Sequence, residues 1–217
     1  MTTNVLIVPG YHGSGEAHWQ SWLQARLPHA RRVDGIDWET PALFDWAQAI
    51  ILNLARSSAP TILVAHSFGC LASALAIAHR PQSVAGAILV APADPERFGV
   101  SGTRDHSYPQ ADSIARFLPE RRLEIRGLMV GSRNDPWMKL PHAHAWATRW
   151  GLSFHDAGAV GHINTDSGFG PWPWIEQLTE ALGNRIIQQR PVTHWQHRSY
   201  RYDLINKPIG AQRLLYA

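Results

Sequence analysis

Residues 61–69, Thr-Ile-Leu-Val-Ala-His-Ser-Phe-Gly, decide the fold of this chain. The first five are uncharged and rich in β-branched side chains, which is typical of a strand buried on both faces. Apolar residues then recur between positions 71 and 78 at the spacing of one helical face. A serine between such a strand and helix lies on a sharp turn that exposes its hydroxyl. The pattern predicts a nucleophile elbow at Ser67.

Small residues flank this serine two positions away on either side, as the turn requires. They are Ala65 and Gly69, so the pattern is Ala-x-Ser-x-Gly instead of Gly-x-Ser-x-Gly. A larger side chain at either place would collide with the neighbouring strand or helix. The alternative is an ordinary strand-to-helix turn in which Ser67 only caps the helix.

Length and composition indicate one globular domain. The chain has 217 residues, of which 45% are hydrophobic and 17% charged, as expected of a protein with a real core. A single cysteine excludes an intramolecular disulfide. The apolar run near the N-terminus is too short for a signal peptide or a membrane span. We therefore expect a cytoplasmic protein that does not contact a membrane.

The positive charge is concentrated at the C-terminal end. Residues 184–217 carry six Lys or Arg and one acid, Asp203, so a net charge of +3 for the chain leaves −2 on residues 1–183. This distribution argues against a nucleic-acid-binding surface in the fold. We predict a domain over residues 1–183 and an appended basic tail over residues 184–217.

Buried-strand patterns alternate with helical patterns along the domain, which predicts an α/β fold with a mostly parallel sheet and helices on both faces. From Pro92 to Glu120 the periodicity fades, except for a helical stretch at 114–118, and we expect a small cap there. Ligands of such sheets bind beyond the carboxyl ends of the strands. The expected strands are 5–8, 33–38, 61–65, 84–91, 125–130 and 152–155; the expected helices are 18–27, 41–54 with Thr40 as its cap, one after Ser67, 140–150 and 174–182.

A serine nucleophile needs a base and a group that orients the base. Asp135 follows the strand expected at 125–130, and His162 follows the last expected strand, where Gly161 allows a sharp turn. The chain order Ser67, Asp135, His162 is that of the α/β-hydrolases. Asp94, after the preceding strand, is an alternative acid.

The oxyanion hole needs two backbone donors. The elbow supplies the amide of Phe68, and the glycine-rich loop after the first strand supplies a second. By position we select the amide of Tyr11, with the neighbouring His12 as an alternative donor and a pocket residue. Trp137 and Trp172 follow strand ends on the same side, so they either wall a compact apolar pocket or pack in the core.

Other chemistries find little support in the sequence. The loop Gly10-x-x-Gly13-x-Gly15 matches neither a dinucleotide-binding pattern nor a P-loop. His142-x-His144 lies in an expected helix, where residues two apart diverge. We therefore expect no cofactor and no metal. Cys70 should point into the core, and His66 should pack or hydrogen-bond beneath the site.

Four motifs resemble those of one family. They are Val-Pro-Gly-Tyr-His-Gly-Ser-Gly at 8–15 with His18-Trp19, Ala-His-Ser-Phe-Gly-Cys at 65–70, Gly-Ser-x-Asn-Asp-Pro-Trp at 131–137, and Gly-His-Ile-Asn at 161–164 followed by Ser-Gly-Phe-Gly-Pro-Trp-Pro. The chain resembles, from about residue 4 to 183, the small serine hydrolases of the YdeN type, a family that includes the retinoblastoma-binding hydrolase of vertebrates. The resemblance implies a minimal α/β-hydrolase without a large lid, with Ser67, Asp135 and His162 as its triad. No Leu-x-Cys-x-Glu is present, so a retinoblastoma-protein partner is not implied.

We therefore expect a carboxylesterase-like serine hydrolase that cleaves small esters, amides or thioesters through an acyl-enzyme on Ser67. Its partners would be small molecules, and it would be a monomer or a small homo-oligomer. The alternative is a catalytically silent binding protein of the same fold, which recruits an acidic partner through its basic tail.

Overall fold

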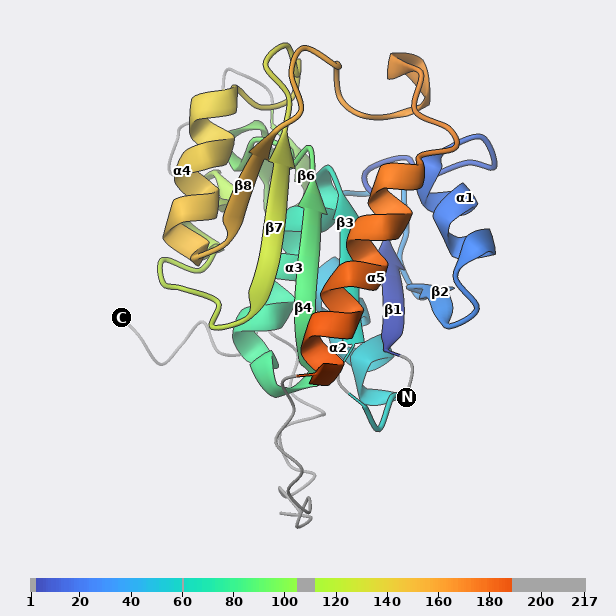
Figure 1. Cartoon of the computed structure of the whole chain (residues 1–217). Coiled ribbons are helices and arrows are strands. Elements are labelled where there is room, and N and C mark those ends of the chain that lie inside the picture. The colour runs from blue at the N-terminus through green and yellow to red at the C-terminus, as the bar shows by residue number, and fades with distance from the viewer. Residues whose placement is uncertain (1–2, 60, 105–111, 189–217) are drawn as a thin grey trace.

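A six-stranded parallel sheet forms the centre of the protein (Figure 1). The computed structural model describes residues 3–59, 61–104 and 112–188. The strand order is β2-β1-β3-β4-β7-β8, and every neighbouring pair is parallel. The strands are β1 (Asn4–Val8), β2 (Ala30–Arg32), β3 (Thr61–His66), β4 (Val84–Val90), β7 (Arg126–Gly131) and β8 (Ser153–Asp156).

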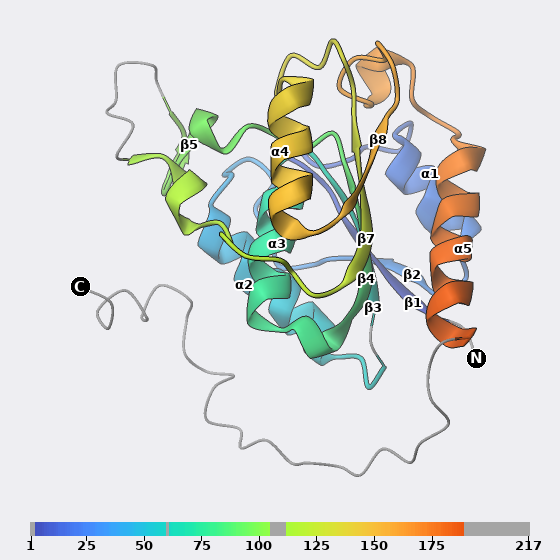
Figure 2. The ribbon, with the colours of Figure 1, turned by 60° about the vertical axis from the view of Figure 1, so that its left-hand side comes forward.

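Helices cover both faces of this sheet (Figure 2). Three pack on one face: α2 (Leu43–Ala55), α3 (Phe68–His79) and α4 (Leu140–Trp150). Two pack on the other: α1 (Trp19–Arg26) and α5 (Pro173–Gln188). The predicted three-layer α/β fold is therefore confirmed.

The elbow strand β3 contributes to two separate cores. Leu63 and Ala65 pack with the α2–α4 layer, whereas Ile62 and Val64 pack with the α1–α5 layer. Every residue of β3 is buried. Successive strand side chains point to opposite faces, so a strand covered on both faces must be apolar at every position. This explains the uninterrupted apolar run in the sequence.

The second strand differs from the prediction of residues 33–38. β2 lies earlier, at Ala30–Arg32, and pairs with β1 at the edge of the sheet. Its arginines hydrogen-bond to loop and helix groups, Arg31 to Asn53 and Arg32 to Ser14. An edge strand held by such long polar side chains carries no apolar signal. The apolar Val33 does pack in the core, but the chain after it turns at Gly35.

Two helix ends also differ from the prediction. The helix α2 begins at Leu43 after Ala42, without a side-chain cap, because the Thr40 hydroxyl donates to Asp37 instead. The helix α5 continues to Gln188 and so crosses residue 183, where we placed the end of the domain. The remainder of the predicted tail, 189–217, lies outside the described residues.

The described part of the segment between β4 and β7, residues 91–104 and 112–125, forms only small elements. They are the 3₁₀ helices η2 (Pro95–Arg97) and η4 (Ile114–Phe117) and a two-stranded antiparallel ribbon, β5 (Phe98–Gly99) and β6 (Gly102–Thr103). Phe98 and Ile114 anchor them in the larger core. Two further 3₁₀ helices are η1 (Pro81–Ser83) and η5 (Thr165–Ser167). In the described ranges, no helix has the length and apolar character needed to cross a membrane.

Candidate active site

Ser67 lies on a strained turn between β3 and α3. Its backbone has φ 53° and ψ −126°, a conformation that a residue with a side chain rarely adopts. The Ser67 amide donates to the Val90 carbonyl of the adjacent strand, and its hydroxyl makes no capping hydrogen bond to α3. The interpretation of Ser67 as a helix cap is therefore wrong.

Close packing around Ser67 explains the small residues on both sides of it. A β-carbon on Gly69 would come within 2.7 Å of the Val8 carbonyl oxygen, and a β-carbon on Gly10 would come within 2.6 Å of the Ser67 β-carbon. Ala65 is fully buried between β1 and β4. The elbow is thus pressed directly against the loop after β1.

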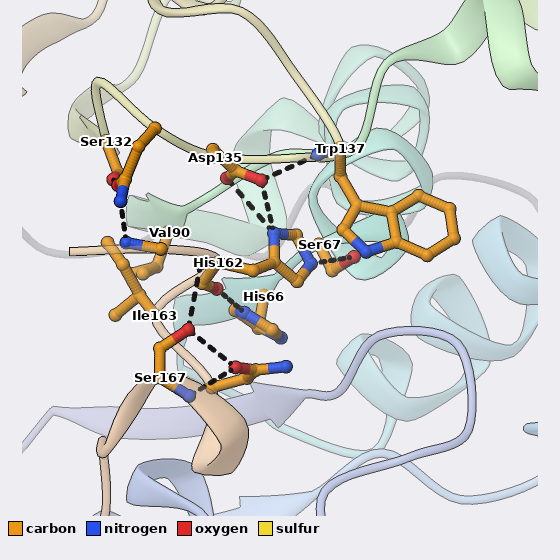
Figure 3. Close-up of polar contacts among 12 residues, drawn as sticks. His66, Ser67, Val90, Ser132, Asp135, Trp137, His162, Ile163 and Ser167 are labelled. Carbon is orange, nitrogen blue, oxygen red and sulfur yellow. Dashed lines mark hydrogen bonds and ion pairs between the residues drawn. The ribbon is translucent and has the colours of Figure 1, made fainter. Parts of the chain in front are cut away.

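His162 connects the serine to Asp135 (Figure 3). Its Nε2 lies 2.9 Å from the Ser67 hydroxyl, and its Nδ1 lies 2.9 and 3.0 Å from the two carboxylate oxygens of Asp135. An ionised carboxylate only accepts, so Nδ1 carries the proton and Nε2 is free to accept from Ser67. Asp135 also accepts from the Trp137 amide at 2.8 Å. The three residues predicted from the sequence therefore form one hydrogen-bonded chain.

Asp94, the alternative acid, lies elsewhere. Its carboxylate accepts from the Glu96 amide at the start of η2 and faces His142 Nδ1 at 3.6 Å. The structure does not bring it to His162.

A set of polar side chains that the sequence analysis missed holds the His162 loop in place. Asn134 accepts from the Gly161 amide at 2.7 Å, and the Ser132 hydroxyl accepts from the Val160 amide at 3.1 Å. On the other side, the Ser167 hydroxyl accepts from the His162 amide at 3.0 Å. All three of these polar side chains, Ser132, Asn134 and Ser167, lie within the quoted motifs or their continuation, and this position was the only signal for them in the sequence.

Two buried histidines lie beside His162. The His66 ring hydrogen-bonds through Nε2 to the His162 carbonyl at 2.9 Å, so the prediction that it bonds beneath the site is confirmed. Burial, and then the nearby His162 and His18 rings, hold the pKa of His66 well below its usual value. Burial, and then Arg32 and His162, lower the pKa of His18 to about 4. Both rings are therefore neutral at physiological pH.

The two amides predicted to form the oxyanion hole belong to Tyr11, in the loop after β1, and Phe68, at the start of α3. The amide of Tyr11 donates to no residue that the structure describes, and Phe68 occupies the first position of α3, where a helix leaves its amides unpaired. The His12 amide is occupied, because it donates to the Trp38 carbonyl at 2.9 Å. The choice of His12 as alternative donor is therefore wrong. Its exposed ring pairs with Glu39.

The two candidate pocket tryptophans lie in different places. Trp137 packs against the His162 ring, with ring centroids 5.9 Å apart, and stacks on Phe98. Trp172 instead packs against Trp19 on the α1–α5 side of the sheet. The structure brings Trp137, but not Trp172, to His162.

The remaining candidates are occupied elsewhere. Cys70 is buried, its thiol points to the Val90 carbonyl, and burial raises the pKa of this thiol well above its usual value. His142 faces Asp94, whereas His144 packs on Phe154. Within the described part of the chain, no three His, Cys, Asp or Glu side chains gather as a metal site requires.

Comparisons with known proteins identify the family and the fold. The family model named serine hydrolase matches residues 5–181. A solved YdeN-like hydrolase of Pectobacterium atrosepticum is 31% identical, with 85% of this chain and 92% of that chain covered and a TM-score of 0.74. The solved YdeN of Bacillus subtilis superposes with a TM-score of 0.63 at 23% identity, over 83% of this chain and 98% of the other. In sequence, the hydrolase YdeN of B. subtilis strain 168 is 34% identical over 100 residues, 42% of this chain and half the length of that relative.

Proposed function

The chain belongs to the serine hydrolase family, as a YdeN-like hydrolase of the α/β-hydrolase fold, and from this premise we propose that it hydrolyses small carboxylic esters through an acyl-enzyme on Ser67. One observation carries the proposal. Ser67 Oγ, His162 and Asp135 are joined by hydrogen bonds of 2.9 to 3.0 Å at the carboxyl ends of three parallel strands.

The first step forms the acyl-enzyme. Ser67 Oγ attacks the ester carbonyl carbon while its proton passes to His162 Nε2, and Asp135 stabilises the resulting imidazolium. The carbonyl oxygen becomes an oxyanion that accepts from the amides of Phe68 and Tyr11. The carbon–oxygen bond to the leaving group then breaks, and His162 returns its proton to the departing alkoxide.

The second step releases the acid. A water molecule gives a proton to His162 Nε2 and attacks the acyl carbon, and a second oxyanion forms in the same place. Its collapse breaks the bond to Ser67 Oγ, which takes back the proton from His162. Serine, histidine and aspartate are then restored, and the products are one carboxylic acid and one alcohol.

The packing around the triad favours small acyl groups. Trp137 lies beside His162 and is stacked on Phe98. Phe98 is itself buried against Phe68 of the elbow. These rings occupy space on one side of Ser67, and the described part of the segment between β4 and β7 has only short elements. We therefore propose esters of short acids as substrates, with small amides and thioesters as weaker ones.

A series of p-nitrophenyl esters tests this proposal. We expect kcat/KM to be highest for acetate or butyrate and to fall for octanoate and longer chains, with Ser67→Ala inactive on all of them. Equal turnover by wild type and Ser67→Ala would show that this serine is not the nucleophile. Absence of turnover on every ester, amide and thioester would instead favour the silent binding protein.

A further inference from the structure

The backbone carbonyls of His162 and Ile163 each accept a hydrogen bond from a buried side chain, and the two side chains come from different elements, β3 and α1. The His162 carbonyl accepts from His66 Nε2 at 2.9 Å. The Ile163 carbonyl accepts from the indole Nε1–H of Trp19 at 2.8 Å, across 144 residues of sequence. Figure 3 shows the His66 bond beside the Ser67–His162 contact.

The backbone that these two bonds hold is strained. Ile163 has φ 50°, in the left-handed region, where a β-branched residue is a genuine outlier. Its side chain is fully buried. A strained conformation persists only when its surroundings fix it. The hydrogen bonds from His66 and Trp19 are the side-chain contacts that fix the two peptide units flanking this residue.

The contacts of the His66 ring determine which of its nitrogens carries the proton. A carbonyl only accepts, so Nε2 carries the proton and donates. His66 is 4% exposed, and its ring centroid lies 4.9 Å from that of His162 and 5.0 Å from that of His18. The ring is thus a neutral, fixed donor that lies between the rings of His162 and His18.

We propose that His66 and Trp19 are positioning residues, which hold the strained 162–163 backbone so that the His162 ring reaches Ser67 and Asp135 together. This inference rests on the proposed function for its kinetic consequence. Loss of either bond lets the peptide relax toward ordinary φ values, and the imidazole moves with the Cα of His162. A displacement of about 1 Å at a reacting group costs on the order of 10²-fold in rate.

Three variants and two controls test the proposal. His66→Leu removes the donor, whereas His66→Gln keeps an N–H donor, because the amide nitrogen of glutamine can replace Nε2. Trp19→Phe removes the indole donor and keeps an aromatic ring. The controls lose the same kinds of bond elsewhere: His79→Leu removes a ring-to-carbonyl bond to Leu75, and Trp150→Phe removes a buried indole-to-carbonyl bond to Pro119.

Kinetics give the first readout. We expect His66→Leu to lower kcat on p-nitrophenyl acetate by about 10²-fold, with KM close to the wild-type value, and His66→Gln to recover much of the loss. Trp19→Phe should lower kcat in the same direction, and both controls should keep it. A wild-type kcat in His66→Leu, or an equal loss in the two controls, would overturn the proposal.

The proton NMR resonance of His162 Nδ1–H gives a readout that needs no substrate. Its hydrogen bond to Asp135 places it far downfield, and we expect it to shift or broaden in His66→Leu and Trp19→Phe, to be restored in His66→Gln and to be unchanged in the controls. An unchanged resonance in both His66→Leu and Trp19→Phe refutes positioning. If the variants show this pattern of resonances and the wild-type protein cleaves no ester, the proposed function fails and the positioning role stands.

Discussion

Asp135 accepts the Nδ1–H of His162 with both carboxylate oxygens, at 2.9 and 3.0 Å, and its side chain is only 3% exposed. Asp135→Asn replaces an acceptor-only group with one that can donate, which favours the wrong imidazole tautomer. We expect kcat to fall by about 10⁴-fold with the fold intact. Steady-state kinetics on a short p-nitrophenyl ester measure this. The matched Asp94→Asn should retain kcat, and a larger loss there than in Asp135→Asn would reverse the assignment of the acid.

The crowding at Gly69 predicts a stability loss. A methyl group there would meet the Val8 and Pro9 carbonyl oxygens, which are backbone atoms that cannot rotate away. We expect Gly69→Ala to lower the free energy of unfolding, as measured by urea denaturation, by about 1–3 kcal/mol or more. The variant should also have lower activity. The control is Gly15→Ala, because no atom lies within 4 Å of a β-carbon at that position. Equal stability of the two variants would mean that the backbone around Gly69 can move apart to accept a methyl group.

The neutral His18 predicts a pH dependence of stability. The unfolded chain binds a proton at His18 near pH 6.5, whereas burial lowers the pKa in the folded protein to about 4. Between these values the unfolded state holds more protons. The free energy of unfolding therefore falls as pH falls, by up to about 1.4 kcal/mol per pH unit for one histidine. His66, whose pKa is also lowered by burial, adds a contribution of the same sign.

The variant His18→Asn isolates this contribution. His18 caps α1 by accepting from the Gln20 amide, and asparagine is also a good N-cap, so the exchange removes mainly the titrating group. Urea denaturation between pH 6.5 and 4 should show a shallower loss of stability in the variant than in wild type. Parallel curves would show that His18 titrates normally in the folded protein.

A single substitution can remove the free backbone N–H of Tyr11 and leave the hydrogen bonds of the next two amides possible. Tyr11→Pro deletes this N–H, whereas the hydrogen bonds of the His12 and Gly13 amides remain possible. We expect kcat to fall by about 10²–10³-fold, as for loss of one oxyanion donor. Tyr11→Phe keeps the amide and should keep the activity. If the proline variant has native circular dichroism and wild-type kcat, another group supplies the second donor.

Sequence patterns predicted that Ser67, His162 and Asp135 come together, because this arrangement follows from the fold. Parallel strands place their carboxyl ends at one edge of the sheet. An elbow after β3 and loops after β7 and β8 therefore converge, and Ser67, Asp135 and His162 were the residues with suitable chemistry in those loops. The burial of β3 on both faces, with Ile62 and Leu63 on opposite sides of the sheet, was likewise predicted by its uninterrupted apolar run.

The missed features depend on backbone directions that a pattern does not encode. The His12 amide is not available as a donor, because in the folded loop it donates to the Trp38 carbonyl. The edge strand β2 is held by arginine hydrogen bonds rather than by an apolar run. Asn134 and Ser167 brace the His162 loop from opposite sides, and only the folded loop shows which amides they reach.

Covalent labelling with a fluorophosphonate probe tests the central claim most directly. The probe reacts with a serine only when a neighbouring base removes its proton, so labelling measures the Ser67–His162 pair without assuming a natural substrate. We predict one label per chain on wild type, located on Ser67 by peptide mass spectrometry, lost in Ser67→Ala and strongly slowed in Asp135→Asn. No label on wild type, or a label that persists in Ser67→Ala, would contradict the account.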